Sequence, residues 1–325
     1  MNLKDTFERR FPYLRLSITD VCNFRCLYCL PNGYKKTGNL EFLCIEEVIR
    51  LVRAFASLGV VKVRLTGGEP TIRKDLIDIV REIRKNTTIQ KVAITTNGYR
   101  LKTDVEEFYN AGVTSLNVSI DSLNPIKFHE ITGHNQLDSI LAGLEKALKQ
   151  GFDSIKINTV LLKQLNQDDI VLFFEWIKTV PYQVRFIELM ETGLHKDFFK
   201  KNHLSADKIV TYLGDLEFIE KPREFSDGPA RIFTHKNYQG SIGIIAPYAK
   251  DFCKTCNRLR ITAKGHLRLC LFGDSSHDLR PYLQNDQDQQ LLESTILDLL
   301  VLKKPMHNLH NNDVGLMSHL ASLGG

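Results

Sequence analysis

Short runs typical of β-strands alternate with amphipathic helical patterns from the start of the chain to about residue 215. The strand-like runs alternate polar and apolar residues, and the helical segments repeat their apolar residues at the spacing of a helix. The expected strands are Leu14–Thr19, Lys62–Thr66, Val92–Thr96, Leu116–Ile120, Ile155–Val160 and Val184–Leu189. The expected helices are Ile45–Leu58, Asp75–Arg84, Asp104–Ala111, Leu137–Lys149, Asp168–Lys178 and Ser205–Leu213.

Six strand–helix units in series predict a parallel sheet, because consecutive parallel strands need a crossover connection. Six units are too few to close an eight-stranded barrel. We therefore expect an α/β fold built on a partial, TIM-like (βα)6 barrel that is curved and partly open. A flat, doubly wound sheet is the alternative.

Polar side chains recur at alternate positions of these strands, which places them on one face of the sheet. They are Arg15, Ser17, Thr19, Lys62, Arg64, Thr66, Thr95, Asn117, Ser119, Asp121, Lys156, Asn158 and Arg185. Parallel strands that are buried on both faces read instead as almost continuous apolar runs. The pattern predicts a wide, polar lumen, with helices covering the apolar face.

Five of these lumen positions are cations. They are Arg15, Lys62, Arg64, Lys156 and Arg185. Burying like charges together is costly unless an anion fills the space between them. Guanidinium forks and ammonium groups both suit phosphate oxygens. The set as a whole favours a polyphosphate ligand, although each cation alone could equally form a surface ion pair.

Beyond about residue 215, shorter strand-like segments are separated by Gly and Pro turns. We expect residues 1–215 to form the partial barrel and residues 216–325 to form a C-terminal region rich in β-structure. Hairpins are expected from Ile232–Thr234, Ser241–Ala246, Leu259–Thr262 and Leu267–Leu269, and a helix from Leu291–Lys303.

Three cysteines, Cys22, Cys26 and Cys29, lie within eight residues directly after the first expected strand. Three thiolates satisfy three corners of a cubane iron–sulfur cluster and leave the fourth iron open to a substrate or cofactor. The alternatives are three buried structural thiols or a zinc site. Zinc usually takes a fourth Cys or His nearby, whereas the next histidine is His129.

The second group of cysteines is Cys253, Cys256 and Cys270. A turn at residues 263–266 would bring Cys270 back beside the CxxC pair. By ligand type alone, an iron–sulfur cluster and a zinc site completed by His266 or His277 are evenly matched. The first triplet favours a second cubane. Arg258 and Arg260 would then project on one face beside it.

The composition limits the classes of function. The chain has 325 residues, of which 43% are hydrophobic and 25% charged, so it suits one large domain or two. Its net charge of +5 is mild, and the chain has no run of basic residues. Both features favour a small anionic ligand over nucleic acid. Neither a signal peptide nor a membrane-spanning stretch is recognisable. Seven cysteines in two clusters plus Cys44 do not suggest a disulfide framework, and reduced metal-binding thiols point to the cytoplasm.

Several motifs together resemble a known family. The CxxxCxYC loop and the segment Thr66-Gly-Gly-Glu69-Pro70 resemble the radical S-adenosylmethionine superfamily. A closer similarity, over nearly the whole chain, is to the GTP 3′,8-cyclase family of molybdenum cofactor biosynthesis. The further motifs that carry it are Thr95-Thr-Asn-Gly98, Val184-Arg-Phe-Ile-Glu188, Gly228-Pro-Ala-Arg231, Asn257-Arg-Leu-Arg260 and the final Gly324-Gly325.

The resemblance implies S-adenosylmethionine and two [4Fe–4S] clusters, one on each cysteine triplet, with the open iron of the second facing the guanine of GTP. Positions that match S-adenosylmethionine contacts are Tyr28, Gly68, Glu69, Ser119 and Met190. Positions that match the GTP site are Arg15, Arg64, Thr95, Lys156, Arg258 and Arg260, with Lys62 and Arg185 in the same basic lining. Gly324 and Gly325 match a tail that reaches the active site.

The implied activity is that of a lyase. A 5′-deoxyadenosyl radical would remove the 3′ hydrogen of GTP, and the C3′ radical would attack C8 of the guanine. Reduction by one electron, with a proton, would then give (8S)-3′,8-cyclo-7,8-dihydro-GTP. We expect GTP as substrate and an external electron donor, with no nucleic-acid or membrane partner. Contact with the next enzyme of the pathway and a homodimer stay open. The alternatives are a radical enzyme that modifies a peptide and a zinc protein that binds nucleic acid.

Overall fold

The computed structural model describes residues 3–36, 41–193, 196–224, 227–311, 313–315 and 320–322. Strands and helices alternate in its first part as the sequence predicts, with small shifts at their ends. The strands are β1 (Tyr13–Ser17), β2 (Lys62–Thr66), β3 (Lys91–Thr96), β4 (Ser115–Ser119), β5 (Ser154–Leu161) and β6 (Gln183–Glu188). The helices between and after them are α1 (Ile45–Ser57), α2 (Leu76–Asn86), α3 (Leu101–Ala111), α5 (Leu137–Gln150), α6 (Ile170–Trp176) and α8 (Asp207–Asp215).

Two short helices, α4 (Pro125–Thr132) and α7 (Lys196–Asn202), were not expected from the sequence. Clear signals mark both ends of α4. The Asn124 side chain accepts hydrogen bonds from two backbone N–H groups of its first turn. Gly133 ends the helix in the left-handed conformation, with φ at 74°. With eight residues, α4 is too short for its apolar periodicity to stand out.

All the named strands join one sheet, including those of the C-terminal part. These are β7 (Ile219–Lys221), β8 (Arg231–Thr234), β9 (Ser241–Ile245), β10 (Arg258–Ile261), β11 (His266–Arg268) and β12 (His277–Asp278). The sheet order is β12-β11-β10-β1-β2-β3-β4-β5-β6-β9-β8-β7. Two expected hairpins are present, because β8 pairs antiparallel with β9 and β10 pairs antiparallel with β11.

The sequence did not reveal that two C-terminal strands also extend the parallel sheet. Strand β10 pairs in parallel with β1, and β9 pairs in parallel with β6. The central run from β10 to β9 is therefore parallel throughout. The sheet therefore continues past residue 215 into the C-terminal part. The expected division into residues 1–215 and 216–325 stays a prediction.

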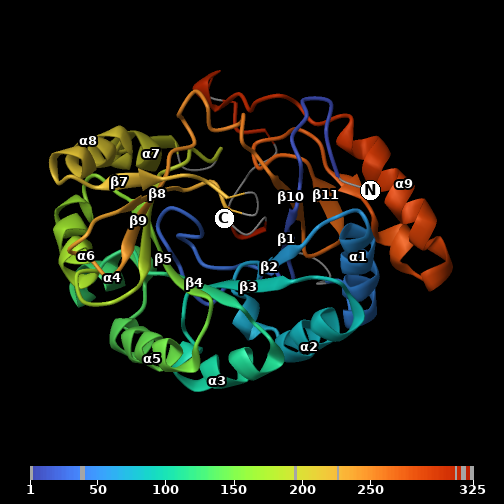
Figure 1. The fold of residues 1–325 in the computed structure, drawn as a ribbon, viewed down its shortest axis with the longest axis horizontal. Coiled ribbons are helices and arrows are strands. Elements are labelled where there is room, and N and C mark those ends of the chain that lie inside the picture. Colours follow the sequence, from blue (N-terminus) through green and yellow to red (C-terminus); the bar gives the residue numbers. More distant parts are fainter. Residues whose placement is uncertain are drawn as a thin grey trace.

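The sheet forms a curved wall, with α1, α2, α3 and α5 along its outer side (Figure 1). Helix α9 (Gln289–Leu300) packs beside α1. Among the described residues the two edge strands, β7 and β12, do not pair with each other, so the barrel stays open. This arrangement confirms the partial α/β barrel and not the flat alternative.

The two faces of the strands have the characters that the sequence predicts. Leu14, Leu16, Val63 and Leu65 are fully buried in the apolar core beneath the helices. The residues between them lie on the opposite, concave face, because side chains alternate along a strand. In the described part of the chain, no helix is both long and apolar enough to cross a membrane. The expected Gly324-Gly325 tail lies outside the described residues.

Candidate active site

The loop that carries the first cysteine triplet is held by backbone contacts with the turn after β2. The N–H of Gly68 donates to the Thr19 carbonyl at 2.9 Å, and the N–H of Glu69 donates to the Val21 carbonyl at 2.7 Å. A Cβ on Gly68 would lie only 2.3 Å from the Val21 oxygen. Glycine is therefore required here by the chain's own cysteine loop. Its contact with S-adenosylmethionine stays a prediction.

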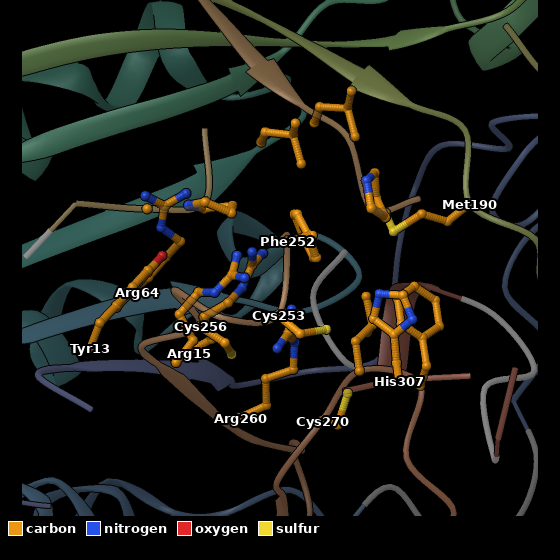
Figure 2. A pocket seen from close by; sticks show the side chains of 18 of the residues that line it. Tyr13, Arg15, Arg64, Met190, Phe252, Cys253, Cys256, Arg260, Cys270 and His307 are labelled. Carbon is orange, nitrogen blue, oxygen red and sulfur yellow. The ribbon is translucent and has the colours of Figure 1, made fainter. Parts of the chain in front are cut away.

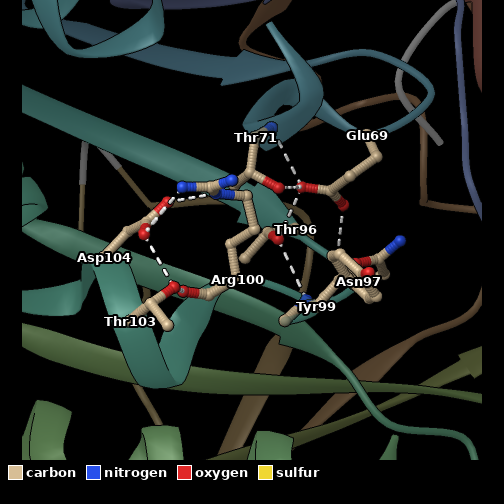
Figure 3. A network of polar contacts seen from close by, with 9 residues as sticks. Glu69, Thr71, Thr96, Asn97, Tyr99, Arg100, Thr103 and Asp104 are labelled. Carbon is tan, nitrogen blue, oxygen red and sulfur yellow. Dashed lines mark hydrogen bonds and ion pairs between the residues drawn. The ribbon is translucent and has the colours of Figure 1, made fainter. Parts of the chain in front are cut away.

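Glu69 orders this turn through a buried hydrogen-bond network (Figure 3). Its carboxylate accepts from the N–H and hydroxyl of Thr71, at 3.1 and 2.6 Å, and from the Thr96 hydroxyl at 2.7 Å. A fourth bond comes from the Asn97 N–H at 2.6 Å. Burial raises the pKa of Glu69, and these bonds oppose that rise. The Asn97 amide also donates to Asn23 at 2.9 Å, so the network reaches the cysteine loop.

Among the residues expected to contact S-adenosylmethionine, Tyr28 has a defined partner. Its hydroxyl donates to Asp121 at 2.9 Å, and Asp121 also accepts from the Val160 N–H at 2.9 Å. Burial raises the pKa of Asp121 to about 6. The sequence placed Asp121 only on the polar face, without this role. Ser119 ends β4 and lies in register with Asn158 of β5.

The two cysteine triplets lie on the same side of the sheet. Cys29 of the first and Cys270 of the second pack against one apolar cluster. This cluster consists of Leu271, Phe272, Leu309 and Leu320. Met190 and Tyr28 pack against the same cluster, and their contact with S-adenosylmethionine stays a prediction.

The second triplet opens into a cavity that it shares with the arginines (Figure 2). The space within the cavity, including its open mouth, is about 850 Å³. Among its lining residues are Arg15, Arg64, Arg185, Arg258, Arg260, Met190, Cys253, Cys256 and Cys270. Three expected site residues, Thr95, Lys62 and Lys156, are not among the lining residues, although Lys62 and Lys156 interact electrostatically with Arg64 and Arg185. Thr95 accepts a hydrogen bond from Arg64 at 3.4 Å.

Strand register explains why the arginines converge. Arg260, Arg15 and Arg64 occupy the same level on the neighbouring strands β10, β1 and β2. Arg258 and Lys62 occupy another level, on either side of Tyr13. The parallel pairing of β10 with β1 therefore adds the two arginines beside the second triplet to the row that the first strands supply.

The electrostatics of this row call for an anion. The Nε atoms of Arg64, Arg258 and Arg260 are buried without a hydrogen-bond partner among the described residues. In the same part of the chain, no carboxylate forms an ion pair with any of these three. Burial, reinforced by neighbouring cations, lowers the pKa of Arg185 to about 9 and that of Lys156 to about 6. A polyanion would restore both values by stabilising the charged forms.

Tyr13 belongs to the same site, although it was not among the residues expected from the sequence. Burial alone would raise its pKa, but Arg64, Arg15 and Lys62 outweigh that effect and lower it to about 8. The Lys62 ammonium lies 5.1 Å and the Arg64 guanidinium 5.4 Å from the centre of its ring. The signal was present, because Tyr13 precedes Arg15 by two positions and so shares its face. Phe252 and His307, which also line the cavity, carried no comparable signal.

The thiols of the two triplets differ in their electrostatics. Burial raises the pKa of Cys22 to about 11 and that of Cys29 to about 12. Burial would also raise the pKa of Cys256, but Lys303 and Arg258 lower it to about 6. All seven cysteines are free thiols, and Cys44 lies apart at the start of α1.

Each triplet offers three thiols that interact electrostatically with one another. Three thiols are the donors needed by a cubane iron–sulfur cluster in which cysteines bind three of the four irons. Among the described residues, no three His, Cys, Asp or Glu side chains are grouped as for a single metal ion.

Two family models match successive parts of the chain. The model of the radical SAM superfamily matches residues 16–177, and the model described as Molybdenum Cofactor Synthesis C matches residues 182–309. The chain belongs to the radical S-adenosylmethionine superfamily. The fold of this superfamily binds S-adenosylmethionine and a [4Fe–4S] cluster.

Solved structures of other superfamily members share the fold. Streptococcus suis SuiB bound to S-adenosylmethionine has a TM-score of 0.63 and 15% identity, over 90% of this chain and 68% of that chain. The same protein bound to precursor peptide SuiA has a TM-score of 0.61 and 15% identity, over 90% and 66%. The FeFe-hydrogenase maturase HydG from Carboxydothermus hydrogenoformans has a TM-score of 0.51 and 18% identity, over 63% and 50%. At these identities the similarity concerns the fold alone.

Proposed function

We propose that this protein is a GTP 3′,8-cyclase, a radical S-adenosylmethionine enzyme that acts in the first step of molybdenum cofactor biosynthesis. The observation that carries the proposal is the shared cavity, in which Cys253, Cys256 and Cys270 meet buried arginines from several strands. The match of residues 182–309 to the Molybdenum Cofactor Synthesis C model supports it. A substrate that carries both a triphosphate and a purine base suits such a cavity.

In this proposal the first triplet holds the cluster that binds S-adenosylmethionine, and the second triplet holds a further [4Fe–4S] cluster beside the base of GTP. When bound, the first cluster and S-adenosylmethionine supply, with one external electron, the carbon radical that removes the 3′ hydrogen of GTP. Tyr28, Ser119 and Met190 would contact S-adenosylmethionine. Glu69 fixes the turn that holds the first cysteine loop.

The arginines that line the cavity, together with Lys156, which interacts electrostatically with Arg185, hold the nucleotide. Arg64, Arg185 and Lys156 would bind the triphosphate, because their pKa values are lowered by burial and mutual repulsion that an anion would relieve. Arg258 and Arg260 extend this lining to the second triplet. Fixing the nucleotide at both ends keeps C3′ close to C8 and correctly oriented for bond formation. The C3′ radical then reacts with C8 before it can react with solvent or protein.

A second candidate is a radical enzyme that modifies a peptide, because SuiB, which has been solved with a precursor peptide, shares the fold over most of this chain. The buried arginines weigh against it. An extended peptide does not need a set of cations without carboxylate partners.

Product analysis tests the proposal. The protein is reconstituted anaerobically with iron and sulfide, reduced, and incubated with S-adenosylmethionine and GTP. We expect 5′-deoxyadenosine and a cyclic dihydro-nucleotide, resolved by chromatography and mass spectrometry. Arg258→Ala should lose the cyclic product, whereas Arg81→Ala, an exposed arginine on α2, should retain it. The proposal fails if the loaded protein cleaves S-adenosylmethionine at the same rate with and without GTP and never changes the nucleotide.

A further inference from the structure

The segment that follows α9 lies against the second cysteine triplet. Lys303 is 4% exposed, and its ammonium group donates to the carbonyl of Leu269, the residue before Cys270. The backbone N–H of His307 donates to the thiol of Cys253. One short segment therefore contacts both ends of the triplet. His307 also lies beside Cys270 and Cys253 at the cavity (Figure 2).

Arg9 holds this segment in place from the N-terminal side. Its guanidinium donates to the carbonyls of Lys304 at 2.8 Å, Pro305 at 2.7 Å and Cys253 at 3.1 Å. An ion pair with Asp5 at 2.7 Å orients the same guanidinium. The backbone beside Lys303 is thus held by Arg9, and the Lys303 ammonium group is held by its hydrogen bond to Leu269.

The charge of Lys303 needs a negative partner. A buried ammonium group is costly unless it is paired. Among the described residues no carboxylate forms an ion pair with Lys303, whereas the neighbouring Lys304 pairs with Asp274 at 2.9 Å on the surface. The aromatic ring of Phe11, centred 5.3 Å from the ammonium, compensates only part of the charge.

We propose that Lys303 is the buried counter-ion of the cluster on the second triplet, a positioning residue that holds the thiolates and raises the reduction potential of that cluster. The inference rests on the proposed function, which places a [4Fe–4S] cluster there. Reduction adds one negative charge to a cluster. A fixed positive charge nearby stabilises the reduced form more than the oxidised form, because the attraction grows with the charge.

The test uses the full chain with all three cysteines of the first triplet changed to Ala, so that only the second cluster loads. In this background, Lys303→Met is compared with Lys303→Arg and with the exposed control Lys304→Met. Iron and sulfide per chain are measured first. The reduction potential is then measured by a titration followed by electron paramagnetic resonance.

We expect Lys303→Met to lower the ratio of reduced to oxidised cluster at a fixed potential by about tenfold, a shift of about 59 mV for one electron. Lys303→Arg and Lys304→Met should leave the titration close to that of the background protein. If Lys303→Met does not fold, as judged by circular dichroism, Lys303→Gln carries the test, because its amide can still donate to Leu269.

The outcomes separate the two claims. A background protein that folds but takes up no iron or sulfide overturns the second cluster, and with it the proposed function. A background protein that loads a cluster, and in which the Lys303 variants titrate like Lys304→Met, overturns the role of Lys303 and leaves the proposed function standing.

Discussion

Replacing Lys156 by Met should remove about one proton from the uptake that accompanies GTP binding at about pH 8. Burial, reinforced by Arg185 and Lys62, lowers the pKa of Lys156 to about 6. At about pH 8 its ammonium form is then only about 1% of the population before the nucleotide binds. A triphosphate beside this side chain favours the charged form, so binding should draw in nearly one proton at Lys156.

The sign of the pH dependence follows from this uptake. Because the complex holds more protons than the free protein, GTP affinity should fall as the pH rises above about 6. The fall is up to about tenfold per pH unit for one proton. Below that pH the contribution of Lys156 disappears, since its side chain is already charged. Lys62 and Tyr13, each with a pKa lowered to about 8, add a smaller uptake that the variant retains.

Calorimetry measures this difference. GTP is titrated into reconstituted protein under anaerobic conditions in buffers that differ in ionisation enthalpy, and the slope of the binding enthalpy against that quantity gives the number of protons. Lys91→Met is the matched control, because Lys91 is an exposed lysine on strand β3 of the same sheet. Equal proton uptake by Lys156→Met and the unchanged protein would refute the placement of Lys156 on the triphosphate.

Three further predictions address the remaining parts of the site. Cys22→Ala should abolish cleavage of S-adenosylmethionine, whereas Cys256→Ala should leave some cleavage and stop cyclisation. Chromatography of both products measures this, and cyclic nucleotide from Cys256→Ala would contradict the assigned roles. Arg185→Ala should weaken GTP at least about tenfold, near 1.4 kcal/mol, more than it weakens guanosine in equilibrium dialysis. If the binding of GTP and the binding of guanosine weaken equally, Arg185 does not contact the triphosphate. Glu69→Gln places an amide among four donors and should lower the free energy of unfolding by about 2 kcal/mol or more; a denaturant titration without such a loss would disprove its role in the turn.

Local patterns were sufficient to predict much of the fold. The alternation of strands and helices, the open curvature and the polar concave face all follow from residues that are near one another in the sequence. The arginine row was visible for the same reason, since Arg15 and Arg64 each lie on a strand with a clear period of two.

Long-range pairing could not be predicted in the same way. The parallel contact between β1 and β10 joins residues on opposite ends of the chain, and nothing in either strand specifies its partner. That contact places Arg260 beside Arg15. Lys303 was missed for a similar reason, because it reads as the charged end of an ordinary surface helix. Tyr13 was missed because the expected strand began one residue too late.

The central claim is that S-adenosylmethionine and GTP meet between the two cysteine triplets. Transfer of an isotope tests it most directly, using GTP that carries deuterium at C3′. The account predicts that 5′-deoxyadenosine gains one deuterium for each cyclic nucleotide formed. Cyclic nucleotide formed alongside 5′-deoxyadenosine that carries no deuterium, or no cyclic nucleotide from a protein loaded at both triplets, would contradict it.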